Sequence, residues 1–90
     1  MTQEDALFNW LQIQIVAEAR PQDRSAQDTA AFFRQILQED HQVEDLTYAR
    51  EQEWYILSGR TGEEAWVKRY SAEAVEALLI AIESEPRFNL

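Results

Sequence analysis

The segment whose side chains are best suited to chemistry is residues 39–45, Glu-Asp-His-Gln-Val-Glu-Asp. Carboxylate oxygens suit hard cations and imidazole suits zinc or iron, so a divalent ion could bind here. The metal-ligand candidates are Glu39, Asp40, His41, Glu44 and Asp45. Their spacing matches neither an EF-hand loop nor a His-x-x-x-His pair. The sequence therefore favours a solvated junction between a helix and a strand over a metal site.

Nucleophilic catalysis has little support in this chain. It has one histidine and no cysteine, and its serines are Ser25, Ser58, Ser71 and Ser84. A serine nucleophile needs a base within hydrogen-bond reach. Two of the serines, Ser25 and Ser71, precede helical patterns and are expected to cap helices. No glycine-rich phosphate motif occurs. We expect no enzyme activity and no cofactor.

The chain is strongly acidic, with 17 acidic residues against 8 basic ones and a formal net charge of −9. Such a field repels phosphates and anionic lipids, so we expect no direct nucleic-acid binding and no membrane binding. The charge suits solubility, or alternatively an acidic surface that meets a basic partner. The acidic start and the absence of cysteine predict a cytoplasmic protein.

Residues 54–70 hold both glycines and two of the three tryptophans, and they predict a β-hairpin with its loop at 59–62. The expected strands are about 53–58 and 63–70. In the favoured register Gly59 faces Gly62, and a three-residue loop is the alternative. The other expected pairs are Trp54 with Val67, Ile56 with Ala65, Tyr55 with Trp66, and Glu53 with Lys68.

That register separates two faces of the hairpin. The face with Trp54, Ile56, Ala65 and Val67 is fully apolar and is expected to pack on the helices. The opposite face carries Tyr55, Leu57 and Trp66 beside a Glu53–Lys68 pair. Either a helix covers that second face too, or it is a contact surface, because tryptophan and tyrosine dominate binding hot spots.

Helical periodicity predicts helices at 3–19, 25–40 and 72–84, and a weaker strand at about 43–49. Thr2, Ser25 and Ser71 are the expected caps, and Pro86 follows the last helix. The strict alternation in residues 11–15 leaves a strand as the alternative there. The expected core is Leu7, Leu11, Ile15, Phe32, Phe33, Ile36, Trp54, Ile56, Val67, Val75, Leu78, Leu79 and Ile82.

The first helix carries two apolar stripes, one with Leu7 and Leu11 and the other with Trp10 and Ile13. One small domain has limited area to cover both. The candidate interaction-surface residues are therefore Trp10, Ile13, Tyr55, Leu57 and Trp66.

Ninety residues make one domain, so the sequence predicts a single α+β domain spanning 1–90. Its order is α-α-β-β-β-α, with an antiparallel sheet of two or three strands between helices. The leading function is a protein–protein interaction or regulatory module that also self-associates as a homodimer; the identity of any other protein partner is unknown. Two alternatives remain. One is an acidic inhibitor or immunity-type protein that blocks a basic nuclease or nucleic-acid-binding site. The other is a small-ligand or divalent-metal-binding domain.

Overall fold

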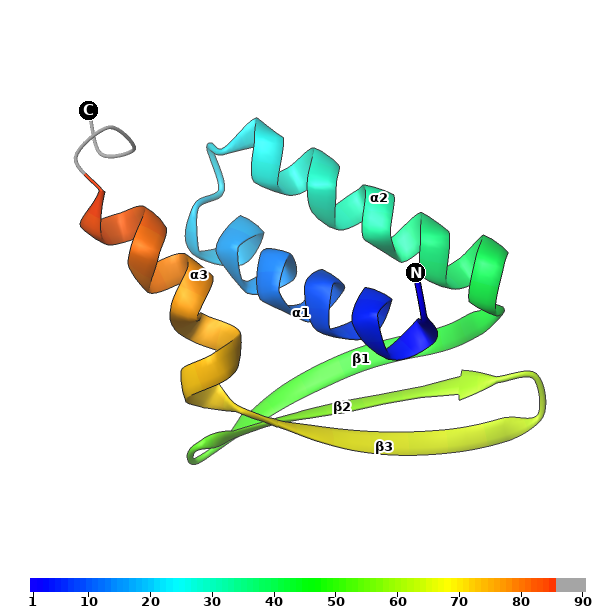
Figure 1. Ribbon diagram of the computed structural model, residues 1–90. Helices are drawn as coiled ribbons and strands as arrows, with labels where there is room; N and C mark the ends of the chain where they lie inside the picture. The colour runs from blue at the N-terminus through cyan, green and yellow to red at the C-terminus, as the bar shows by residue number, and fades with distance from the viewer. Residues whose placement is uncertain (86–90) are drawn as a thin grey trace.

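The structure, a computed structural model, describes residues 1–85, so the segment from Pro86 onward lies outside the described residues. Its elements are α1 (Gln3–Ala19), α2 (Arg24–His41), β1 (Val43–Glu51), β2 (Trp54–Thr61), β3 (Glu64–Ser71) and α3 (Ala72–Ser84). The three strands form one antiparallel sheet in the order β1-β2-β3. The predicted α+β order and the three-stranded alternative are confirmed (Figure 1).

Two helices begin at the caps that the sequence predicts. The Thr2 hydroxyl accepts a hydrogen bond from the Asp5 backbone N–H at 3.1 Å. The Ser71 hydroxyl accepts one from the Ala74 N–H, also at 3.1 Å. Each bond satisfies an amide that has no partner within its helix. Residues 11–15 lie inside α1, so the strand alternative there is wrong.

The cap of α2 differs from the prediction. Asp23, not Ser25, is the N-cap, and its carboxylate accepts from the Ala26 N–H at 3.1 Å. The same carboxylate forms an ion pair with Arg20 at 3.4 Å. Aspartate is at least as good a cap as serine, and α2 begins at Arg24, one residue before the predicted start.

Both turns of the sheet contain two residues, which corrects the predicted hairpin register. Thr61 pairs with Glu64, so the β2–β3 turn is Gly62-Glu63 and not the segment between Gly59 and Gly62. Gly62 has a φ of +62°, the sign that the first position of a type II′ turn requires. Gly59 therefore lies within β2, opposite Trp66.

A β-bulge in β1 determines which of its side chains face the helices. Glu44 pairs with Arg60 and Thr47 pairs with Ser58, so β1 has one extra residue between the two pairs. Asp45, within the bulge, has a φ of +56°. The extra residue shifts the alternation, so that Leu46 is buried on the same side as Val43.

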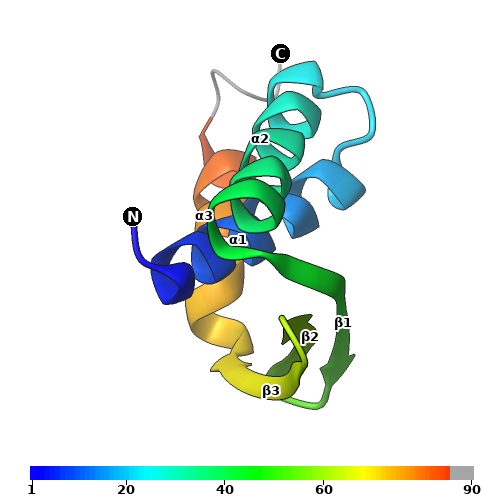
Figure 2. The same cartoon turned by 90° about the vertical axis from the view of Figure 1, so that its right-hand side faces the viewer.

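All three helices lie on one side of the sheet (Figures 1 and 2). The apolar and aromatic side chains on this inner face are Val43, Leu46, Tyr48, Tyr55, Leu57, Trp66 and Tyr70, and Arg50, Thr61, Glu64 and Lys68 share the face. Trp54, Ile56, Ala65 and Val67 share the other face. Their predicted grouping is confirmed, but the prediction that this face packs on the helices is wrong, because it points away from them.

The core fills the space between the inner face and the helices. Predicted core residues that are buried are Leu7, Leu11, Ile15 and Val75. The half-buried ones are Phe33, Ile36, Ile56, Leu78, Leu79 and Ile82. Phe32, Trp54 and Val67 are wrongly predicted as core. Phe32 lies on the exposed side of α2, and the two strand residues lie on the face that no described helix covers.

Candidate protein-interaction surface

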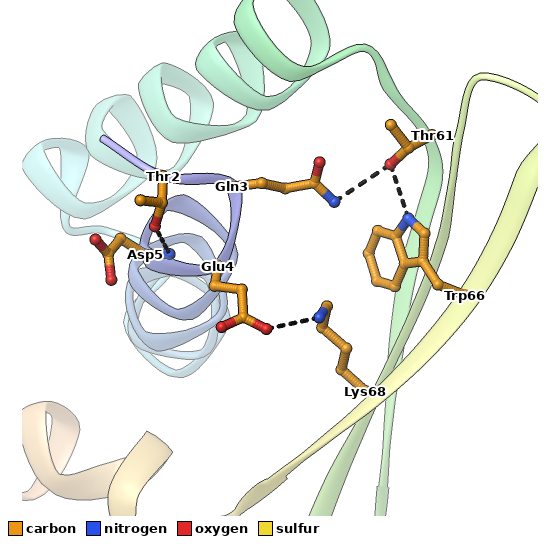
Figure 3. Close-up of polar contacts among 7 residues, drawn as sticks. All are labelled: Thr2, Gln3, Glu4, Asp5, Thr61, Trp66 and Lys68. Carbon is orange, nitrogen blue, oxygen red and sulfur yellow. Dashed lines mark hydrogen bonds and ion pairs between the residues drawn. The ribbon is translucent and has the colours of Figure 1, made fainter.

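Polar contacts fix the inner face of β3 to the start of α1 (Figure 3). Trp66 Nε1 donates to Thr61 Oγ1 at 2.9 Å, and Gln3 Nε2 donates to the same oxygen at 3.2 Å. Lys68 Nζ donates to Glu4 Oε1 at 2.8 Å, and this hydrogen bond raises the pKa of Lys68. These bonds satisfy the polar tips of the inner face, so its apolar parts can be buried.

Two inner-face tyrosines reach helix carboxylates in the same way. Tyr48 Oη donates to Glu18 at 2.8 Å, and Tyr55 Oη donates to Glu76 at 2.6 Å. Burial, with the hydrogen bond to Glu76 second, raises the pKa of Tyr55 to about 12. Burial and Glu18 also raise the pKa of Tyr48. Arg50 also contacts Glu76, in an ion pair at 3.0 Å.

The five predicted interaction-surface residues do not form a surface. Trp10, Tyr55 and Leu57 are buried in the core. Trp66 is half-buried on the inner face, and Ile13 of α1 is half-buried against the cluster of Val16, Ala17, Ala26 and Ala30. The excess of large apolar residues is real, but it is located elsewhere, on the side of the sheet that was expected to be core.

The exposed side of the sheet is here called the outer face. It comprises Glu44, Thr47, Ala49 and Glu51 of β1, Trp54, Ile56, Ser58 and Arg60 of β2, and Ala65, Val67 and Arg69 of β3. The helices lie on the opposite side of the sheet (Figure 2). An antiparallel sheet with one face open to solvent normally presents polar side chains there. This one presents a tryptophan, an isoleucine and a valine.

The apolar part of the outer face is centred on β2 and β3. Val67 is 67% exposed, Trp54 is 38% exposed, and Ile56 is half-buried between its neighbours. The Arg69 guanidinium stacks over the Trp54 ring, 4.2 Å from its centroid. A stacked arginine stabilises this orientation of the indole. The outer face therefore offers an aromatic ring with a guanidinium partner beside aliphatic side chains.

The outer face is nearly neutral within a chain of net charge −9. Together with its bulge it carries three carboxylates, Glu44, Asp45 and Glu51, against the guanidiniums of Arg60 and Arg69. Arg60 pairs with Glu44 at 2.7 Å and with Asp45 at 3.4 Å. The other acidic residues lie on the helices, in the turns and at the ends of the sheet.

A hollow of about 310 Å³ adjoins the outer face at the start of α3. Its lining residues are Arg50, Glu53, Trp54, Ser71, Ala72, Glu73 and Glu76. Trp54 belongs to both features, so the outer face and the hollow form one continuous surface. The carboxylates make this end of the surface more acidic than its middle.

A second, smaller hollow lies among the helices and is here called the three-helix groove. It measures about 200 Å³ and is lined by Ile13, Val16, Asp23, Ser25, Ala26, Thr29 and Ile82. Its apolar lining comes from Ile13 and Val16 of α1, Ala26 of α2 and Ile82 of α3. The Asp23 carboxylate in its wall is already engaged as the cap of α2.

The five predicted metal-ligand candidates do not converge. Glu44 and Asp45 pair with Arg60, and Glu39 accepts a hydrogen bond from Gln35 at 2.9 Å. Within residues 1–85, no three histidine or acidic side chains are placed to hold a metal ion. Of the described helices, none combines the length and apolar character needed to cross a membrane.

Comparison of the chain with protein-family models, with curated proteins and with solved structures finds no match. The argument for function therefore rests on the geometry of the surface.

Proposed function

We propose that the protein is a protein-interaction module of no catalytic activity that docks a partner on its outer face. The observation that carries this proposal is the exposure of Trp54 and Val67 on a face that the described helices leave uncovered. Leaving such side chains in water costs roughly 25 cal/mol per Å² relative to burying them. A partner that covers them recovers that free energy.

The composition of the outer face suits a protein better than a small ligand. Interface hot spots are enriched in tryptophan and arginine, and here Arg69 stacks on Trp54 at 4.2 Å. The surrounding threonine, serine and ion-paired arginine make a polar rim around aliphatic residues. The outer face is open and broad, whereas small ligands are usually enclosed in deep pockets.

The charge of the chain bears on what kind of partner would associate fastest. A net charge of −9 steers positively charged proteins toward the module. A basic partner would also contact the carboxylates of Glu53 and Glu73 in the adjoining hollow. Partner binding that weakens steeply with added salt would favour the acidic-inhibitor form of this proposal.

The test compares the same substitution at two exposed aliphatic residues, Val67 on the outer face and Ile80 on α3. Val67→Glu places a charge on the outer face, and Ile80→Glu places the same charge on α3, where Ile80 is 60% exposed. Both variants should fold, because exposed substitutions change stability by about 0.5 kcal/mol or less. Chemical cross-linking in the native cytoplasm should give adducts for the wild type and Ile80→Glu that Val67→Glu loses. Equal adducts from all three would refute the outer face as the docking site.

A further inference from the structure

We infer that one occupant of the outer face is the outer face of a second copy of the chain, forming a symmetric dimer of stacked sheets. This inference rests on the proposed function, since it assigns a partner to the same surface. It is carried by the arrangement of charges on that surface, which is complementary to itself.

The neutrality of the outer face removes the main objection to self-association. Two copies with net charges of −9 repel each other over most of their surfaces. The outer face with its bulge carries three carboxylates against two guanidiniums, and Arg60 pairs with both Glu44 and Asp45. A second copy therefore meets less repulsion when it approaches this face.

The charges that remain are placed at opposite edges of the sheet. Glu51 ends β1 at one edge and pairs with Trp54, which in turn pairs with Ser71 of β3. Arg69 lies two residues before Ser71 at the other edge. Its guanidinium lies over the Trp54 ring. It therefore points toward the cross-strand row that Glu51, Trp54 and Ser71 form. Acid and base thus flank the indole on either side.

A two-fold axis parallel to β2 sets β1 of one copy over β3 of the other. Glu51 of each copy then faces the row of the second copy's Ser71, within reach of the second copy's Arg69. The middle of the interface brings Ile56 and Trp54 against their own equivalents. Sheets that pack face to face in this aligned way lie about 10 Å apart and cross at about 30°.

The size of the face sets the expected strength of the dimer. Strands of eight residues are about 27 Å long, and three strands are about 14 Å wide. The area of the face, which is the product of this length and width, is small compared with the roughly 800 Å² per partner of a standard interface. We therefore expect a dissociation constant in the micromolar range.

Sedimentation equilibrium of the purified protein tests the dimer directly. Between about 10 µM and 1 mM, where a small interface populates both states, the mean mass should rise from 10.5 kDa toward twice that value. Val67→Glu should stay monomeric, and Ile80→Glu should behave like the wild type. A wild type that remains monomeric at 1 mM, or equal association by both variants, would overturn the inference.

A charge exchange tests the arrangement of the two copies. Glu51→Arg alone and Arg69→Glu alone should each associate at least several-fold more weakly, because like charges then face each other. A mixture of these two variants should recover the wild-type mass, since each then meets an opposite charge on the other. A mixture that stays as weak as its components would overturn the arrangement.

The two proposals fail separately. A strictly monomeric wild type whose cytoplasmic adducts still disappear in Val67→Glu would remove the second copy as occupant and keep the outer face as a docking site for another protein. Adducts that survive in Val67→Glu would remove both.

Discussion

Gly59 lies directly opposite Trp66, and a Cβ atom added at Gly59 would stand 2.8 Å from Trp66 Cζ2. Real Cβ atoms essentially never approach another heavy atom so closely. The indole thus lies against the bare backbone of β2, where its N–H reaches Thr61 at 2.9 Å. The Trp66 indole lies on the inner face of the hairpin, and the face with Trp54 is left open.

Gly59→Ala should destabilise the fold by about 1–3 kcal/mol, because the added methyl group overpacks the inner face. Urea unfolding followed by circular dichroism measures this cost. In a Trp66→Leu background the same substitution should cost clearly less, since the smaller side chain leaves room. An equal cost in both backgrounds would show that Gly59 and Trp66 are not coupled.

Gln52→Gly should stabilise the fold by about 0.5–1 kcal/mol. Gln52 has a φ of +57° at the first position of the β1–β2 turn, a left-handed conformation that costs an L-residue about 1–2 kcal/mol. The greater freedom of glycine in the unfolded chain offsets part of the gain. Glu53→Gly is the control, since Glu53 has no positive φ, and it should destabilise. A lower melting temperature for Gln52→Gly would contradict the turn geometry.

Asp23→Ala should cost about 1 kcal/mol, because it removes the cap of α2 and leaves the Ala26 N–H without its acceptor. Ser25→Ala should change the free energy of unfolding by less than about 0.5 kcal/mol, although the sequence pattern makes Ser25 the expected cap. Thermal denaturation of the two variants compares them. The opposite ranking would restore Ser25 as the N-cap.

Stability should fall between pH 10 and pH 12. The pKa of Tyr55 is about 12 in the folded protein and 10.0 as its ordinary value, so the unfolded chain loses this proton first. The stabilisation is fully present below pH 10 and is lost as the pH rises toward 12. Urea unfolding at stepwise higher pH measures the decline. Tyr55→Phe should be less stable at pH 8 and should lose less on going to pH 12; an unchanged pH dependence would remove Tyr55 as a cause.

The sequence predicts the elements well because their signals are local. The apolar spacing of α1 and α3, with caps at Thr2 and Ser71, fixes both helices at the predicted bounds. The start of α2 lies one residue before the predicted one because Asp23, two residues before the expected cap Ser25, accepts the capping hydrogen bond instead. Helical periodicity alone does not identify which residue caps the helix.

The register and the orientation of the hairpin could not be predicted in the same way. Both glycines were expected in one turn, but Gly62 serves the turn and Gly59 accommodates Trp66. Orientation depends on long-range partners: Lys68 reaches Glu4, 64 residues away in the chain. Because such contacts satisfy the polar ends of its side chains, the face with Tyr55 can be buried against the helices. The open surface is therefore the one around Trp54. The signal in the sequence that could have indicated this register was the separation of Gly59 from the turn at Gly62.

Side-chain NMR during dilution tests the central claim, that a second copy docks on the outer face, at the level of single residues. From about 1 mM to about 10 µM, the indole N–H of Trp54 and the methyl groups of Ile56 and Val67 should shift as the dimer dissociates. The methyl groups of Ile13 and Ile82 in the three-helix groove should not. Shifts confined to the groove would contradict the outer face as the docking surface, and spectra that do not depend on concentration would remove the second copy as its occupant.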